Sequence, residues 1–140
     1  MNCSQLYAGA SRRLTEVQSE FLGVSRLGGP DEDYDAVAAA LKMPHVYYLA
    51  SHAGCGCGWE YLHVDSEWDL KNLASRNALE GYLRHELARG PLFLLSTCVD
   101  SLGKEPVAVE QRSLGQLFAE FDGWRVPYST PYIRVAELTA

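Results

Sequence analysis

The residues best suited to chemistry are one histidine and two cysteines in a glycine-rich segment, residues 52–58. His52, Cys55 and Cys57 alternate with glycines at positions 54, 56 and 58. Thiolate sulfur and imidazole nitrogen are ligands that zinc favours in tetrahedral sites, and closely spaced ligands often come from one flexible turn. The spacing therefore predicts a metal site, with zinc as the expected ion.

Three ligands need a fourth, and Cys98 is the first candidate. If the strand that starts near residue 46 and the strand that starts near residue 92 run parallel, their carboxyl ends share one edge of the sheet. Ligand sites are common at such an edge. Cys98 would then lie near His52 and Cys55, and His63 is the alternative fourth ligand.

The same centre would be hydrolytic if three protein ligands left one position for a water molecule. The general base would then be Asp65, Asp100 or Glu60. No pattern in the sequence identifies a catalytic residue beyond this. Whether the chain is an enzyme therefore stays open.

Two other interpretations of the glycine-rich segment are open as well. Cysteine is among the most buried residue types and often packs as a small apolar side chain, so the chain could be a non-catalytic protein-interaction or regulatory module in which both thiols are structural. A thiol redox role would need an activated thiolate, and His52 is the only obvious local helper. A disulfide between Cys55 and Cys57 would close a small, strained ring and would be labile.

The composition narrows the class of protein and its partners. Of 140 residues, 47% are apolar and 21% are charged, which is typical of a folded globular domain. The net charge of −6 and the absence of a basic cluster argue against a nucleic-acid partner. No apolar run approaches the roughly 20 residues of a membrane span, and no signal peptide is evident. We expect a soluble cytoplasmic protein with reduced thiols, whose partner is another protein or a second copy.

Hydrophobic periodicity and turn residues predict an α+β fold, because strands alternate irregularly with helices. We expect one domain over residues 1–140, with a mixed sheet of about five strands and three to four helices. Residues 1–30 are expected to include a less regular N-terminal extension. The predicted helices are 14–22, 31–43, 75–89 and 113–121, and the predicted strands are 46–50, 59–64, 92–99, 107–111 and 132–138. The first two strands would form a hairpin with the cysteines at its tip, and the last would lie at an edge.

The strand over residues 46–50 is followed by Ser51, His52, Cys55, Cys57, Gly58 and Trp59. This run resembles small uncharacterised bacterial proteins, which carry a strand followed by Ser-His-x-x-Cys-x-Cys-Gly-aromatic. Residues 78–98 are similar to the segment that follows in those proteins. The resemblance covers about half of the chain and implies no known activity, cofactor or partner.

Overall fold

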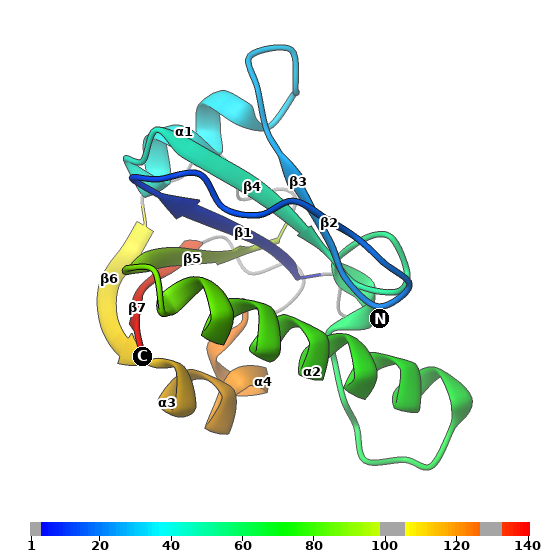
Figure 1. Ribbon diagram of the computed structural model, residues 1–140. Coiled ribbons are helices and arrows are strands. Elements are labelled where there is room, and N and C mark those ends of the chain that lie inside the picture. Colours follow the sequence, from blue (N-terminus) through cyan, green and yellow to red (C-terminus); the bar gives the residue numbers. More distant parts are fainter. Residues whose placement is uncertain (1–3, 99–105, 127–132) are drawn as a thin grey trace.

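One seven-stranded mixed sheet organises the chain (Figure 1). The structure is a computed structural model that describes residues 4–98, 106–126 and 133–140. The sheet order is β2-β3-β4-β1-β5-β7-β6, and all neighbouring strands are antiparallel except the parallel pair β6 and β7. The strands are β1 (Gln5–Ala10), β2 (Val17–Gln18), β3 (Gly23–Arg26), β4 (His45–Ala50), β5 (Leu92–Thr97), β6 (Pro106–Ser113) and β7 (Ile133–Thr139).

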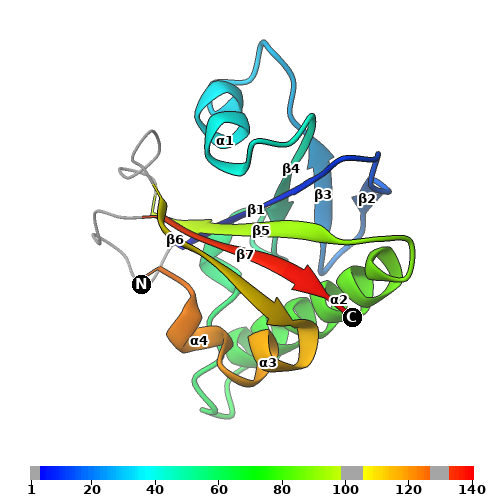
Figure 2. The same ribbon diagram turned by 90° about the vertical axis from the view of Figure 1, so that its left-hand side faces the viewer.

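Four α-helices cover the two faces of the sheet unequally (Figures 1 and 2). They are α1 (Tyr34–Leu41), α2 (Glu67–Leu87), α3 (Leu114–Ala119) and α4 (Phe121–Trp124), and a short 3₁₀ helix, η1 (Gly56–Gly58), follows β4. Helix α1 lies on one face, and α2, α3 and α4 lie on the other. Within the described ranges, no helix is long and apolar enough to cross a membrane. The α+β class is confirmed, with two more strands than the sequence predicted.

Strand β1 lies in the middle of the sheet and is buried on both faces. Its Leu6 and Ala8 belong to the core under α2, whereas Tyr7 packs in the core under α1, and all three are fully buried. The alternation is the normal consequence of strand geometry, in which successive side chains point to opposite faces. The less regular N-terminal extension expected over residues 1–30 instead supplies β1, β2 and β3.

Three predicted elements differ in the structure. The helix over 14–22 is wrong, because Leu14 and Leu22 enter the core from a largely extended chain that contains β2. The strand over 59–64 is also wrong, since only Trp59 is buried and the chain then runs irregularly toward α2. The final strand, β7, lies between β5 and β6, so it is an inner strand and not an edge strand.

Helix α2 begins at Glu67, eight residues before the start of the helix predicted over 75–89. Ser66 caps it by accepting a hydrogen bond from the backbone N–H of Asp69 at 3.1 Å. The first turns of the helix bury polar side chains, Asp69, Asn72 and Ser75, which bond to the preceding loops. Because these buried residues are polar, the spacing of apolar residues in the sequence does not reveal this face of the helix.

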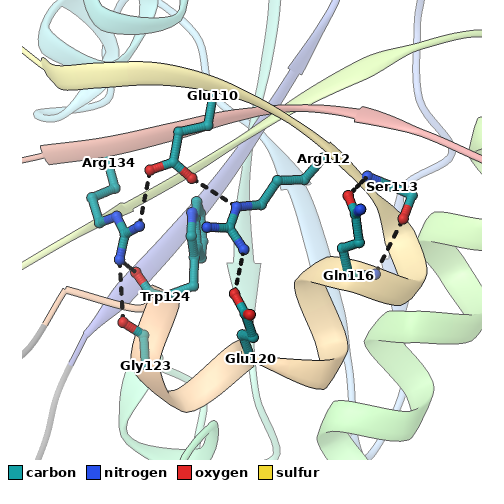
Figure 3. Close-up of polar contacts among 8 residues, drawn as sticks. All are labelled: Glu110, Arg112, Ser113, Gln116, Glu120, Gly123, Trp124 and Arg134. Atoms are coloured by element: carbon teal, nitrogen blue, oxygen red, sulfur yellow. Dashed lines mark hydrogen bonds and ion pairs between the residues drawn. The ribbon is translucent and has the colours of Figure 1, made fainter.

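A network of charged side chains fixes α3 and α4 to the edge strand β6 (Figure 3). Arg112 binds Glu110 and Glu120, both at 2.7 Å, and Arg134 of β7 binds Glu110 at 2.9 Å. Ser113 and Gln116 form a capping box at the start of α3, which confirms the predicted cap. These contacts position the two short helices beside α2.

Glu86 connects α2 to the segment that follows β1. Its fully buried carboxylate accepts a hydrogen bond from the N–H of Thr15 at 2.9 Å and pairs with Arg89 at 3.3 Å. Burial alone would raise the pKa of Glu86, but the Thr15 hydrogen bonds and the nearby Arg89 and Arg12 outweigh it and lower the pKa. The charged carboxylate therefore stabilises the folded state above the ordinary glutamate pKa of about 4.3.

Glu86→Gln should lower the free energy of unfolding by about 3 kcal/mol near neutral pH, because it removes one partner of a buried ion pair. The difference between this variant and the wild type should shrink as the pH falls through the lowered pKa, where the wild-type carboxylate takes up a proton. Urea unfolding at several pH values measures both effects. Glu80→Gln, on the exposed pair with Arg84, is the control and should change stability by less than about 1 kcal/mol.

Candidate functional site

The glycine-rich segment forms a tight turn that leaves the end of β4 and folds back over the start of β1. Ser51 organises it: its hydroxyl donates to the carbonyl oxygen of Cys55 at 2.7 Å and accepts from the N–H of Gly58 at 3.1 Å. The backbone N–H of Gly54 donates to the carbonyl of Ser51 at 2.9 Å. Gly54 has a φ of +77°, so one glycine serves the turn by its conformation.

Two further glycines are needed because the backbone passes very close to other atoms. A Cβ on Gly56 would lie 2.2 Å from the carbonyl oxygen of Ser4, and one on Gly58 would lie 2.3 Å from the hydroxyl oxygen of Ser51. At positions 56 and 58 their purpose is close packing of the segment against the start of β1 and the end of β4.

His52 is held against the start of α2. Asn72 donates through Nδ2 to the carbonyl of Glu60 at 2.6 Å, so its Oδ1 is the acceptor that faces Nε2 of His52, also at 2.6 Å. His52 therefore carries a proton on Nε2. Its ring also meets Trp68 edge to face, with 4.7 Å between centroids. Both of these contacts of the imidazole ring are with residues of α2.

The two cysteines of the segment differ in state. Cys55 is a half-buried free thiol whose Sγ accepts a hydrogen bond from the N–H of Cys57 at 3.4 Å, whereas Cys57 is disulfide-bonded. Burial raises the pKa of Tyr48 to about 12, and the neighbouring Cys55 contributes to this rise. Tyr48 packs on the α1 side of the sheet, whereas His52 contacts α2. The expectation of reduced thiols does not hold for Cys57.

The predicted fourth ligands, Cys98 and His63, come from other parts of the fold. Strands β4 and β5 run in the same direction, as predicted, but β1 separates them and pairs with both. Two strand spacings amount to about 10 Å, and Cys98 is buried at the far side of that interval. His63 is exposed and contacts Tyr61, with ring centroids 4.2 Å apart.

Among the described residues, no group of three or more histidine, cysteine, aspartate or glutamate side chains could hold a metal ion. The predicted set of His52, Cys55, Cys57 and Cys98, with His63 as an alternative, is therefore not gathered around one point there. Of the predicted bases, Glu60 and Asp65 lie in the loop before α2, and Asp100 lies outside the described residues.

The residue that sequence reasoning missed is Asp69, in the first turn of α2. Its buried carboxylate accepts hydrogen bonds from the N–H of Leu62 at 2.7 Å and from the N–H of Val64 at 2.9 Å. Between these two residues His63 has a φ of +59°, a conformation that costs about 1 kcal/mol or more outside glycine. One side chain thus fixes the shape of the whole loop.

This loop and the start of α2 carry four exposed apolar side chains within nine residues, which we call the 62–70 patch. Its members are 49–60% exposed: Leu62, Val64, Trp68 and Leu70. Figure 1 shows that the loop and the first turns of α2 extend beyond the sheet. A signal for the patch was present in the sequence, because Trp68 and Leu70 are out of phase with the apolar stripe farther along α2.

Comparisons with protein families, with characterised proteins and with solved structures found no match. The resemblance to small bacterial proteins with the same cysteine pattern therefore stays a prediction.

Asp69→Asn should release the loop while leaving α2 intact, because the N–H groups of Leu62 and Val64 bind different oxygens of the carboxylate and an amide has only one oxygen. We expect a loss of about 2 kcal/mol in the free energy of unfolding and faster hydrogen exchange at the amides of Leu62 and Val64. Asp65→Asn, at an exposed position of the same loop, is the matched control. Unchanged exchange at both amides in Asp69→Asn would contradict the assigned role.

Gly56→Ala should destabilise the fold by about 2 to 3 kcal/mol, because the new methyl group would overlap the backbone of Ser4 and force the turn off β1. Thermal unfolding followed by circular dichroism measures the loss. Gly29→Ala is the control, since a Cβ there meets open space. Equal melting temperatures for the two variants would show that the turn does not depend on this contact.

Proposed function

We propose that the chain is a protein-interaction module that binds its partner through the 62–70 patch. The observation that carries the proposal is the concentration of exposed apolar side chains in this one segment of the chain. Of the five large apolar residues that are exposed in the described part of the chain, four lie within this one segment. Exposed apolar groups that gather in one place, bordered by polar groups, are typical of protein–protein contacts.

The patch is held in shape before any partner arrives. Asp69 fixes the backbone at Leu62 and Val64, Ser66 caps the helix that carries Trp68, and His52 packs against the Trp68 ring. A preorganised surface loses less conformational entropy on binding than a mobile one. This rigidity supports a role in recognition.

The charge around the patch favours one kind of partner. Residues 60–71 contain four carboxylates and one lysine, so their formal charge is −4 + 1 = −3, and the whole chain carries −6. Like charges disfavour pairing of two copies through this surface, and they also disfavour an anionic membrane. We infer a protein partner with an apolar cleft bordered by lysine or arginine side chains.

The test starts with a photoreactive amino acid at position 70 in native cells, with position 109 as the control, and ends with purified components. Partner candidates that crosslink from position 70 alone are purified and titrated with the chain by calorimetry. Leu62→Ser and Trp68→Ser should each weaken binding by about tenfold or more, the usual cost of losing an anchor residue. Val109→Ser should have no effect, because Val109 is as exposed as Leu62 but lies on β6.

Two outcomes would overturn the proposal. Equal weakening of binding by Val109→Ser and Leu62→Ser would deny the patch a specific role. A dimer in sedimentation that Leu62→Ser abolishes would make a second copy the occupant. Both experiments are informative only if the variants melt at the wild-type temperature.

A further inference from the structure

Two cysteines of the glycine-rich turn, separated by one residue, differ in oxidation state. Cys57 is bonded in a disulfide whose second cysteine lies outside the described residues, and Cys55 is a free thiol. The N–H of Cys57 donates a hydrogen bond to Sγ of Cys55 at 3.4 Å. Because Sγ of Cys57 is three covalent bonds from that nitrogen, a thiol and a disulfide lie within a few bond lengths of one hydrogen bond.

The turn keeps the two cysteines close through Ser51. The Ser51 hydroxyl donates to the carbonyl oxygen of Cys55 at 2.7 Å and accepts from the N–H of Gly58 at 3.1 Å. It therefore joins the two ends of the short segment that contains both cysteines. These hydrogen bonds involve no sulfur atom, so they do not depend on the disulfide.

Both cysteines are partly accessible to solvent. Cys55 and Cys57 are each half-buried, and the two residues that precede Cys55, Ala53 and Gly54, are exposed. A Cβ on Gly54 would meet nothing within 4 Å, so the space beside this part of the turn is open. A thiol on a small molecule or on an extended peptide therefore has a path to the turn.

The hydrogen bond at Cys55 suits the reactive form of its sulfur. The thiolate is the nucleophile in thiol–disulfide exchange, and an N–H group binds an anion more strongly than a neutral acceptor. Burial raises the pKa of Tyr48 to about 12, and the neighbouring Cys55 contributes to this rise. The Tyr48 hydroxyl is therefore uncharged near neutral pH and does not repel a thiolate beside it.

We propose that Cys55 and Cys57 form a thiol–disulfide exchange site that oxidises a dithiol substrate. In the first step, the Cys55 thiolate attacks Sγ of Cys57. The Cys55–Cys57 bond forms and the bond from Cys57 to its present partner breaks. The partner sulfur leaves with the electron pair and takes up the proton that Cys55 lost, so the step involves no net oxidation. The new disulfide closes a small, strained ring, and strained disulfides are labile.

The substrate of the second step is a dithiol on a protein or a small molecule. One substrate thiolate attacks the Cys55–Cys57 disulfide and forms a mixed disulfide, and the second substrate thiolate then displaces the cysteine sulfur. The substrate loses two electrons and two protons and becomes a disulfide, while Cys55 and Cys57 become thiols. The disulfide already present at Cys57 supplies the oxidising equivalent for this single turnover. The activity is independent of the function proposed for the 62–70 patch.

The test uses dithiothreitol as the dithiol and protein purified without reductant. The disulfide of Cys57 is followed over time by acid quenching, alkylation and mass spectrometry. It should be reduced about tenfold or more faster in the wild type than in Cys55→Ser, because the internal attack benefits from proximity. Equal rates in the two proteins would overturn the proposal, as would a purified wild-type chain in which Cys57 is a thiol.

A second measurement needs no variant. Alkylation of Cys55 with iodoacetamide before dithiothreitol is added should slow reduction to the rate of Cys55→Ser, and an unchanged rate would contradict the proposal. Cys98→Ala is the matched control, since it removes a buried thiol that follows β5 and should leave the wild-type rate unchanged. An equal loss of rate in Cys98→Ala and Cys55→Ser would also contradict it. If Cys98→Ala does not fold, the comparison of alkylated with untreated wild type still decides.

Discussion

The pairing of β1 with both β4 and β5 is the constraint on which the rest of the structure depends. Leu6 lies opposite Leu49 on one side and Ser96 on the other, so β1 joins the two halves of the sheet. Because β1 is antiparallel to both neighbours, β4 and β5 run in the same direction without touching. The turn after β4 then packs on the start of β1, and Gly56 allows that contact.

The same arrangement places a strand between two segments that carry predicted metal ligands. The backbone of β1 lies between the end of β4, which precedes His52, and the end of β5, which precedes Cys98. The turn itself directs His52 toward α2 and Cys55 toward Tyr48. What the turn supplies is a rigid support, through His52 and Asn72, for the start of α2.

Much of the fold could be predicted from local sequence signals, and the failures have a common cause. The helix that starts after Ser113, the helix that includes α1 and the apolar strand β5 were all predictable, since each depends on neighbours along the chain. Strand β1 was not recognised because burial on both faces removes the alternation of polar and apolar residues. Asp69 and Asn72 were overlooked for a related reason: a buried polar side chain is recognisable only when its partners in a distant loop are known. The site residues were therefore predictable by type. The direction in which each side chain points depends on contacts with distant parts of the chain, which the sequence alone does not reveal.

The position of β7 has a consequence for how the chain acquires its structure. This strand follows every other element in the sequence, yet it is inserted between β5 and β6 and is the neighbour to which β6 is bonded. At the other end of the chain, the edge of β1 that faces away from β4 can be paired only after β5 has been synthesised. Pairings between such distant segments slow folding, because long loops must close before any contact compensates for the lost entropy. During synthesis on the ribosome, the sheet is therefore completed only after β7 has emerged, and until then β6 lacks the neighbour that holds it in the sheet.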